Sequence, residues 1–273
     1  MYKLVALDMD GTLLNSDKVV TERNKKAIMN AKDAGVKVLL ASGRPLEGMT
    51  RYLEELGLTS DNDYVICYNG SLVKRVSDGK TVRTQILSGK DAKKLALIAI
   101  EMGSHIHAFS PERGLITPKN NPYTEHEAII NGLDIVEFDF ADLSDDEQII
   151  KAMIVDDGDA LTEAISKLPS ELYDEYTIVR SADIFLEFLN KDSNKGVGVA
   201  SVAQLLNINP EEVICMGDAE NDHHMINYAG LGVAMGNATE DTKSIADHIT
   251  LSNDESGVAA VLEQYVLELE ATA

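Results

Sequence analysis

Two aspartates separated by one residue, Asp8 and Asp10, directly follow the apolar run Leu4–Leu7. A continuous apolar run without polar alternation predicts a strand that is buried on both faces of a parallel sheet. Ligands of open parallel sheets bind beyond the carboxyl ends of the strands, where both aspartates would lie. Their types and spacing predict a nucleophile at Asp8, an acid/base at Asp10 and a hard cation that holds them together.

The same residues also suit a simple turn, because Asp and Gly are common turn formers. The ends of the other predicted strands decide between the two interpretations. These ends carry Ser42 and Gly43, then Asn69, then Asp218, Asn221 and Asp222. The carboxyl ends of parallel strands lie along one edge of a sheet, and unrelated turns need not be rich in carboxylates. One shared site therefore explains the pattern better than separate turns.

Several carboxylates in one place repel one another and raise one another's pKa. A divalent cation removes this repulsion, and ligands that are all oxygen favour Mg²⁺. Lys195 would add a positive charge at a helix start, although most lysines are simply exposed. The Ser42–Gly43 turn offers a hydroxyl and N–H donors to phosphate oxygens, although it could also cap the helix after Pro45.

Other possible motifs in the chain are weak. If a calcium loop began at Asp218, its position 6 would be His223 rather than Gly and its position 12 would be Ala229 rather than Glu. The two cysteines, Cys67 and Cys215, lie in short apolar runs and have no metal-ligand spacing. We therefore expect reduced thiols in the core and no cysteine zinc site.

The composition limits the partners of this chain of 273 residues, which carries 46 acidic and 24 basic side chains and a net charge of -22. Nucleic acids and anionic membranes require clustered Lys and Arg, so we expect neither as a partner. No signal-peptide pattern and no apolar span of membrane length occur, so we expect a cytoplasmic protein. The helix faces and edge strands are compatible with a monomer or a dimer.

Strands and helices alternate up to residue 70 and again from about residue 194 onward. This alternation predicts an α/β fold with a doubly wound, mostly parallel, Rossmann-like sheet. One of its helices is expected from about residue 46 to 56. We predict a discontinuous core of residues 1–83 and 190–273.

Residues 84–189 lack that rhythm, and we predict that they form an inserted α+β domain. Within it, a strand at 105–109 is followed by a stretch to about residue 140 that contains three prolines. We expect this stretch to be irregular.

Four segments resemble, in order, the four motifs of the haloacid dehalogenase superfamily phosphatases. They are Asp8–Leu13, Ser42–Arg44, Lys195–Gly196 and Gly217–Asp222. The insertion between the second and third motifs resembles the C2-type cap of the Cof-type subgroup. Each motif is short, but four motifs in this order and spacing are highly specific, and the resemblance covers nearly the whole chain.

The resemblance implies a role for each matching residue. Asp8 would attack phosphorus and form an aspartyl-phosphate, while Asp10 would act as general acid and then as general base. Mg²⁺ would be bound by Asp8, the Asp10 backbone carbonyl and Asp218. The phosphoryl oxygens would be held by the Met9 N–H, Ser42, Gly43 and Lys195, with Asn221 beside them.

Asp222 would lie one shell further out and orient Lys195 or a metal-bound water. The pair His223–His224 departs from the family pattern, and we expect both rings to be solvated near a helix start.

The function that this resemblance implies is Mg²⁺-dependent hydrolysis of small phosphorylated metabolites, sugar phosphates above all. A phosphomutase is the alternative on the same core, since it would pass the phosphoryl group from Asp8 to a sugar. A non-catalytic sensor of phosphorylated metabolites is a weaker alternative, because Asp10 would then have no purpose.

Overall fold

The computed structural model describes residues 1–267, whose contacts divide into two compact units. The core unit consists of Met1–Arg83 together with the chain from Asn194 onward, and the cap unit is Thr84–Ser193. The second boundary was predicted after residue 189, but it lies after Ser193. Contacts of Asn190 agree with this boundary, because the Gln85 amide donates to its Oδ1 at 3.0 Å and its Nδ2 donates to the Ile86 carbonyl at 3.0 Å, both within the cap unit.

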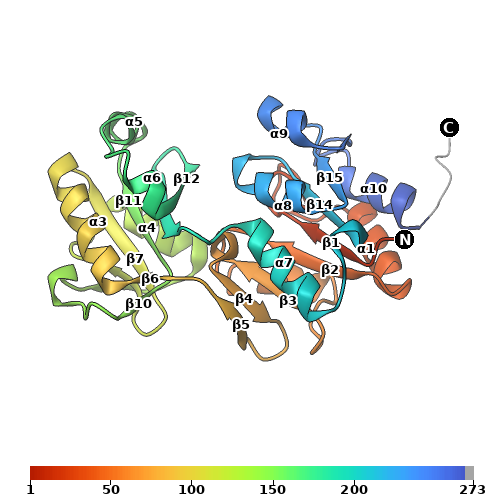
Figure 1. Cartoon of the computed structure of the whole chain (residues 1–273), viewed down its shortest axis with the longest axis horizontal. Coiled ribbons are helices and arrows are strands. Elements are labelled where there is room, and N and C mark those ends of the chain that lie inside the picture. The colour runs from red at the N-terminus through yellow and green to blue at the C-terminus, as the bar shows by residue number, and fades with distance from the viewer. Residues whose placement is uncertain (268–273) are drawn as a thin grey trace. The chain divides into compact units, whose positions relative to one another are not determined.

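The core unit is built on one sheet of eight strands, coloured red to brown and blue in Figure 1. Every neighbouring pair from β16 to β3 is parallel, and β4 pairs antiparallel with β3. In spatial order the strands are β16 (His248–Ile249), β15 (Leu231–Ala234), β14 (Val213–Gly217), β1 (Leu4–Leu7), β2 (Lys37–Ala41), β3 (Tyr64–Cys67), β4 (Leu72–Arg75) and β5 (Thr81–Thr84). The predicted α/β class with a mostly parallel sheet is confirmed.

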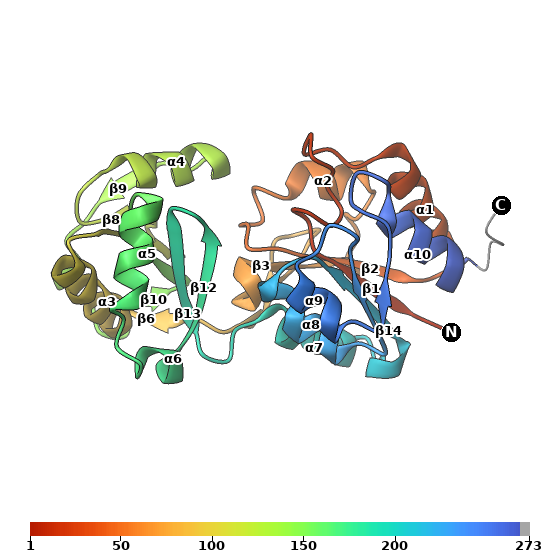
Figure 2. The same ribbon diagram turned by 90° about the horizontal axis from the view of Figure 1, so that it is seen from above.

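Helices cover both faces of this sheet, as Figure 2 shows for α1 and α10 on one face and α7 and α8 on the other. All four residues of β1 are buried, as a strand covered on both faces requires. The cysteines Cys67 and Cys215 are buried and unpaired, as expected. The core helices are α1 (Glu22–Asp33), α2 (Thr50–Glu55), α7 (Lys195–Leu205), α8 (His223–Tyr228), α9 (Glu240–Ile245) and α10 (Gly257–Tyr265), with 3-10 turns at Tyr68–Gly70, Pro210–Glu212 and Glu220–Asp222.

The prediction of a helix over residues 46–56 is wrong for its first turn. Helix α2 begins only at Thr50, because Leu46–Met49 closes a separate turn in which the Met49 N–H donates to the Leu46 carbonyl at 2.9 Å. Gly48 lies inside this turn, and glycine is a poor helix former. The longer non-helical segment leaves the Gly48 carbonyl available to accept from Arg44 Nη1 at 3.4 Å.

The cap unit contains a six-stranded sheet and a small two-stranded one. The larger sheet has the spatial order β12 (Tyr176–Ala182), β13 (Phe185–Asn190), β11 (Lys151–Val155), β7 (His105–Ser110), β8 (Gly114–Thr117) and β9 (Ile135–Glu137), and the smaller pairs β6 (Leu87–Ser88) with β10 (Gln148–Ile149). Side chains of α3 (Gly89–Met102), α5 (Gly158–Ser166) and α6 (Leu172–Glu175) share one apolar cluster with alternate residues of β7, β11 and β13. A 3-10 turn at Phe140–Asp142 joins this cluster.

The stretch from residue 110 to 140 is not irregular, so that prediction is wrong. It forms β8, helix α4 (Pro122–Asn131) and β9. The prolines misled the sequence analysis because one of them, Pro122, occupies the first turn of α4, where proline is favoured. The Asn121 side chain caps the helix by accepting from the Thr124 N–H at 2.9 Å, and Gly132 ends it with a φ of 65°.

Helix α4 covers polar side chains on the other face of the cap sheet. His107 is fully buried there, with its Nδ1 3.0 Å from Thr124 Oγ1. Nearby, the Lys151 ammonium lies 3.3 Å from Glu187 and 3.7 Å from Glu127. Burial, together with the Lys151 charge, lowers the pKa of His107 from 6.5 to about 3. The ring is therefore neutral in the folded protein at ordinary pH.

This buried histidine should make the stability of the cap depend on pH. The unfolded chain takes up a proton on His107 below pH 6.5 and the folded chain does so only near pH 3, so the free energy of unfolding should fall as pH falls between these values. The contribution should approach about 1.4 kcal/mol per pH unit. Urea unfolding at pH 7 and pH 5 should show a smaller loss for His107→Asn than for the wild type; an equal loss would contradict the assignment.

Candidate active site

Four charged residues of the predicted motifs meet at one edge of the core sheet, namely Asp8, Lys195, Asp218 and Asp222. Asp8 follows β1 directly, and its backbone N–H donates to the Met216 carbonyl of the neighbouring strand β14 at 3.0 Å. Asp218 follows β14, and Ser42 follows β2. The sheet register therefore brings the first and last motifs together, although 210 positions separate Asp8 from Asp218.

Lys195 occupies the centre of this group and is completely buried. Its ammonium donates to Asp8 Oδ1 at 2.6 Å and to Asp222 Oδ1 at 2.7 Å. Lys195 is the first residue of α7, which Asn194 caps by accepting from the Val197 N–H at 2.9 Å. Burial alone would lower the pKa of Lys195, but the two carboxylates outweigh burial and raise it. The lysine is a fixed positive charge.

Asp222 has no contact with solvent and serves two structural purposes. While its Oδ1 accepts from Lys195, its Oδ2 accepts from the backbone N–H groups of Asp218 at 2.9 Å and Ala219 at 3.1 Å. The carboxylate lies directly against Gly217, where the Cβ of any larger residue would overlap it. The contacts agree with the predicted role of orienting Lys195.

Asp8, Asp218 and Asp222 form a group that fits a divalent cation. One carboxylate oxygen from each lies within 4.8 Å of the others. Three carboxylates here face a single ammonium, an excess of two negative charges that a divalent cation would match. Burial, together with the neighbouring carboxylates, raises the pKa of both Asp8 and Asp218, and the Thr12 hydroxyl donates to Asp218 Oδ1 at 2.9 Å.

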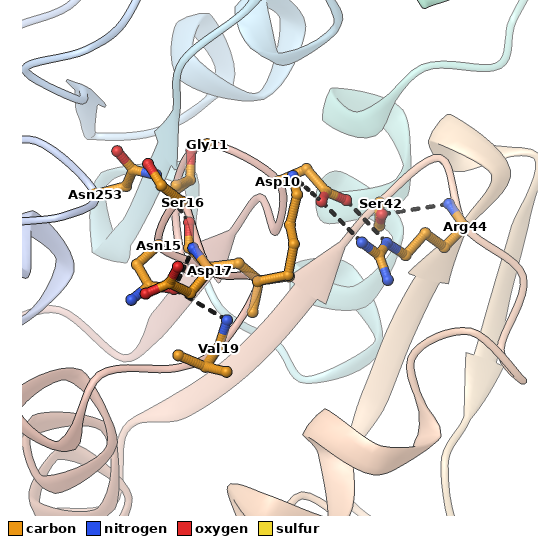
Figure 3. Close-up of polar contacts among 12 residues, drawn as sticks. Asp10, Gly11, Asn15, Ser16, Asp17, Val19, Ser42, Arg44 and Asn253 are labelled. Carbon is orange, nitrogen blue, oxygen red and sulfur yellow. Dashed lines mark hydrogen bonds and ion pairs between the residues drawn. The ribbon is translucent and has the colours of Figure 1, made fainter. Parts of the chain in front are cut away.

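The Asp10 side chain lies apart from this group and pairs with two cations. Arg44 donates to it through Nε and Nη2, both at 2.8 Å, and the Lys18 ammonium donates at 2.9 Å. Figure 3 shows Asp10 and Arg44 pointing toward one another. Burial would raise the pKa of Asp10, but the bonds from Arg44 and Lys18 outweigh burial and lower it. In the sequence, Arg44 was part of the second motif but had no predicted role, and Lys18 belonged to no motif.

Apart from Lys195, the predicted phosphate-binding residues come from three loops. Ser42 is buried, and its N–H donates to the Ile66 carbonyl at 3.0 Å, which fixes the start of the Ser42–Gly43 turn. Met9 is fully buried beside Asp8. Asn221 is half-buried and donates through Nδ2 to Asn69 Oδ1 at 3.2 Å.

Asn69 therefore links the second and fourth motifs, a role that the sequence analysis did not assign. Its N–H donates to the Ser42 carbonyl at 2.9 Å while its side chain holds Asn221. Tyr68 and Asn69 adopt φ values of 51° and 52°, and the following Gly70 has 101°. Left-handed backbone at consecutive non-glycine residues costs free energy and is typically retained at functional sites. The only sequence signal was the Asn-Gly pair at the end of a strand.

The histidine pair agrees only in part with the expectation, because His223 is half-buried and hydrogen-bonded. His223 Nε2 lies 2.8 Å from the hydroxyl of Thr242, which is completely buried. His224 is exposed. His223 thus ties the start of α8 to α9, a contact that spacing in the sequence does not reveal.

A family model described as haloacid dehalogenase-like hydrolase matches residues 5–262. The chain belongs to the haloacid dehalogenase-like hydrolases. The match covers all four motifs and both units. Within residues 1–267, no helix is long and apolar enough to cross a membrane.

Individual proteins align along nearly the whole chain. A putative phosphatase, YxeH, from Bacillus subtilis is 39% identical over 98% of this chain and 99% of its own length. The B. subtilis 5-amino-6-(5-phospho-D-ribitylamino)uracil phosphatase YcsE is 32% identical over 97% of this chain and 96% of its own. A haloacid dehalogenase-like hydrolase structure from Bacteroides thetaiotaomicron superposes with a TM-score of 0.83 at 33% identity, over 97% of this chain and 99% of that one.

The contact between Gly217 and Asp222 gives a test of the site's architecture. Gly217→Ala should displace Asp222 and, through it, Lys195, because the new Cβ overlaps the carboxylate. We expect a loss of about 1–3 kcal/mol in stability and of about 10- to 100-fold in kcat/KM. Gly158→Ala is the control, since its Cβ would meet only atoms of Asp183, the nearest at an ordinary contact distance of 3.5 Å. Unchanged stability and activity of Gly217→Ala would disprove the packing argument.

Proposed function

We propose that this protein is a Mg²⁺-dependent phosphatase that hydrolyses small phosphorylated metabolites through an aspartyl-phosphate on Asp8. The observation that carries the proposal is the buried ammonium of Lys195 between Asp8 and Asp222, with Asp218 alongside. A phosphoryl group that reached Asp8 would meet a fixed positive charge within hydrogen-bond distance of the nucleophile. The overall charge of -22 repels anions, so such a local positive site is required.

In the first step, an oxygen of Asp8 forms a bond to phosphorus as the bond from phosphorus to the leaving oxygen breaks. The leaving oxygen keeps that electron pair and takes a proton from Asp10. Asp10 must first take up this proton from solvent or from the bound phosphate monoester, because Arg44 and Lys18 hold its pKa below the ordinary value. Lys195, the Ser42 hydroxyl and the N–H groups of Met9 and Gly43 hold the phosphoryl oxygens, with Asn221 beside them.

In the second step, water attacks the aspartyl-phosphate and Asp10, now ionised, removes its proton. Asp8 leaves as a carboxylate, and inorganic phosphate is released. Asp8, Asp218 and the Asp10 backbone carbonyl would hold Mg²⁺. The ion would reduce the repulsion between the negative Asp8 carboxylate and the negative phosphate. Asp222 would keep Lys195 in place through both steps.

Sugar phosphates are the substrate class that we favour. The support is a resemblance between several segments of this chain and the bacterial sugar-phosphatase YidA. These segments are Tyr68–Gly70, Ser104–Ala108, Phe185–Glu187, Asn194–Gly196 and Val233–Ala238. The name of the relative YcsE adds a phosphorylated ribityl compound to the candidates.

A phosphomutase remains the second candidate, because it needs the same Asp8 and Asp10. It differs in the acceptor, since the phosphoryl group would pass to a sugar hydroxyl rather than to water. Conversion of a sugar 1-phosphate into the 6-phosphate without release of phosphate would favour it.

Phosphate release should be measured with a panel of sugar phosphates, nucleotides and the phosphorylated ribityl compound, with Mg²⁺ and with EDTA. We expect release from sugar phosphates that stops when the metal is removed. Release that persists at full rate in EDTA would contradict the metal requirement. No release from any compound by folded, Mg²⁺-loaded protein would contradict the phosphatase proposal.

Asp8→Asn should reduce turnover by about 10⁴-fold or more, because the amide is a poor nucleophile. Asp10→Asn should still bind substrate but turn over about 10²- to 10⁴-fold more slowly. The matched control is Asp78→Asn, which alters an exposed carboxylate paired with Arg75 in the core hairpin. Normal activity of Asp8→Asn would refute the nucleophile, and an unchanged rate for Asp10→Asn would remove its acid/base role.

A further inference from the structure

The carboxylate of Asp10 is held by a fork of hydrogen bonds from Arg44. Nη2 donates to Oδ1 and Nε donates to Oδ2, each at 2.8 Å. This two-bond geometry fixes both the position of a carboxylate and the rotation of its plane. Lys18 adds a third bond at 2.9 Å, also to Oδ1. Figure 3 shows the two bonds between Arg44 and Asp10.

Arg44 is itself fixed from several directions. Its side chain is 23% exposed, its Nη1 donates to the Gly48 carbonyl at 3.4 Å, and its guanidinium lies 5.8 Å from the centre of the Tyr52 ring. Its backbone N–H donates to the Ser42 hydroxyl oxygen at 3.2 Å. The fork is therefore anchored to the loop that carries Ser42, the predicted phosphate-binding residue. An ion pair that was only a surface contact would not need this anchoring.

Lys18 reaches Asp10 from a turn with its own internal bonds. The Asn15 side chain accepts from the N–H groups of Asp17 at 3.1 Å and Val19 at 3.0 Å, and Lys18 has a φ of 59°. The Tyr52 hydroxyl donates to the Lys18 carbonyl at 3.0 Å. Tyr52 thus contacts both the Arg44 guanidinium and the Lys18 backbone. The Lys18 side chain is 58% exposed and is the weaker partner of Asp10.

The bonds leave the two oxygens of Asp10 unequal. Oδ1 accepts from both Arg44 and Lys18, whereas Oδ2 accepts only from Arg44 Nε among the described residues. A carboxylate oxygen has two lone pairs, so Oδ2 retains one that can hold a proton or accept one. The side chain therefore offers a single defined direction for proton transfer.

We propose that Arg44, assisted by Lys18, is a positioning residue that aims Asp10 Oδ2 at the oxygen that leaves phosphorus. The proposal deepens the proposed function and rests on it. In the first step the proton moves from Oδ2 to the leaving oxygen, which keeps the electron pair of its broken bond to phosphorus. In the second step Oδ2 takes a proton back from the attacking water. Arg44 itself touches no reacting atom.

The alternative role for Arg44 and Lys18 is direct binding of a second anionic group on the substrate. The two roles differ in what they do to the leaving group. A positioning residue matters most when the leaving oxygen is strongly basic and needs a proton, and least when the leaving group is stable as an anion. A residue that binds substrate changes the rate by the same factor for leaving groups of similar size.

The test is the dependence of kcat/KM on leaving-group basicity, measured with Mg²⁺-loaded full-length protein and a series of aryl and alkyl phosphates. This constant reports the step in which the leaving group departs, so a slow second step does not mask it. We expect a shallow dependence for the wild type and a steep one for Asp10→Asn. Arg44→Met should resemble Asp10→Asn and lose about 10²-fold more on an alkyl phosphate than on p-nitrophenyl phosphate.

Two further variants separate charge from geometry. Arg44→Lys keeps the charge without the fork and should lie between the wild type and Arg44→Met, and it serves as the folded variant if Arg44→Met is unstable. Lys18→Met should have the smallest effect. The matched control is Arg51→Met, because Arg51 packs on the same Tyr52 ring at 4.3 Å but makes no bond to Asp10.

The outcomes distinguish this proposal from the function on which it rests. An equal loss for all leaving groups in Arg44→Met and Arg44→Lys would overturn the positioning role while leaving the phosphatase intact. A steepening in Arg51→Met as large as that in Arg44→Met would overturn it as well. Failure of the wild type to hydrolyse any member of the series would overturn both the positioning role and the proposed function.

Discussion

The site depends on one interaction, the bond of a fully buried ammonium to two carboxylates that come from opposite ends of the chain. Lys195 is held by Asp8 at 2.6 Å and by Asp222 at 2.7 Å. Burying such charges is unfavourable unless each is compensated, and removing one partner from a buried group is more costly than losing an exposed pair. The loop after β14, the start of α7 and the end of β1 must therefore hold one another's positions. The remaining excess of negative charge defines where a cation belongs.

A run of residues with left-handed backbone conformation lies in a loop next to this group. Tyr68, Asn69 and Gly70 have positive φ in succession, and they connect the Ser42 loop to Asn221. Gly70 also lies against the backbone of Asn194, where a Cβ would overlap the Asn194 carbonyl. The strained turn is thus confined between the residue that caps α7 and the loop of the second motif. The contacts with Asn194 and Asn221 hold the backbone of this turn in its strained conformation.

The sequence was informative where one signal dominated. Apolar runs such as Leu4–Leu7 predicted the buried strands, and the chemistry at their ends predicted the group around Lys195. The sequence was misleading where one residue type occurs both in loops and at helix starts. Pro122 suggested an irregular segment, but it begins helix α4. The sequence was silent on contacts made across the fold, such as those of Arg44 and Lys18 with Asp10 or of His223 with Thr242. Such pairs follow from the register of the sheet, which local patterns do not encode.

The position of β1 in the sheet has a consequence for how the protein forms during synthesis. β1 lies between β2, which follows it closely in the chain, and β14, which begins only at Val213. The whole of Thr84–Ser193 is made in the interval, and those residues form a compact unit of their own. Because contiguous domains fold as units during translation, the cap can fold while one edge of β1 still lacks its partner. Asp8 can therefore meet Lys195 and Asp222 only after the cap has been synthesised, so the active site forms late in synthesis.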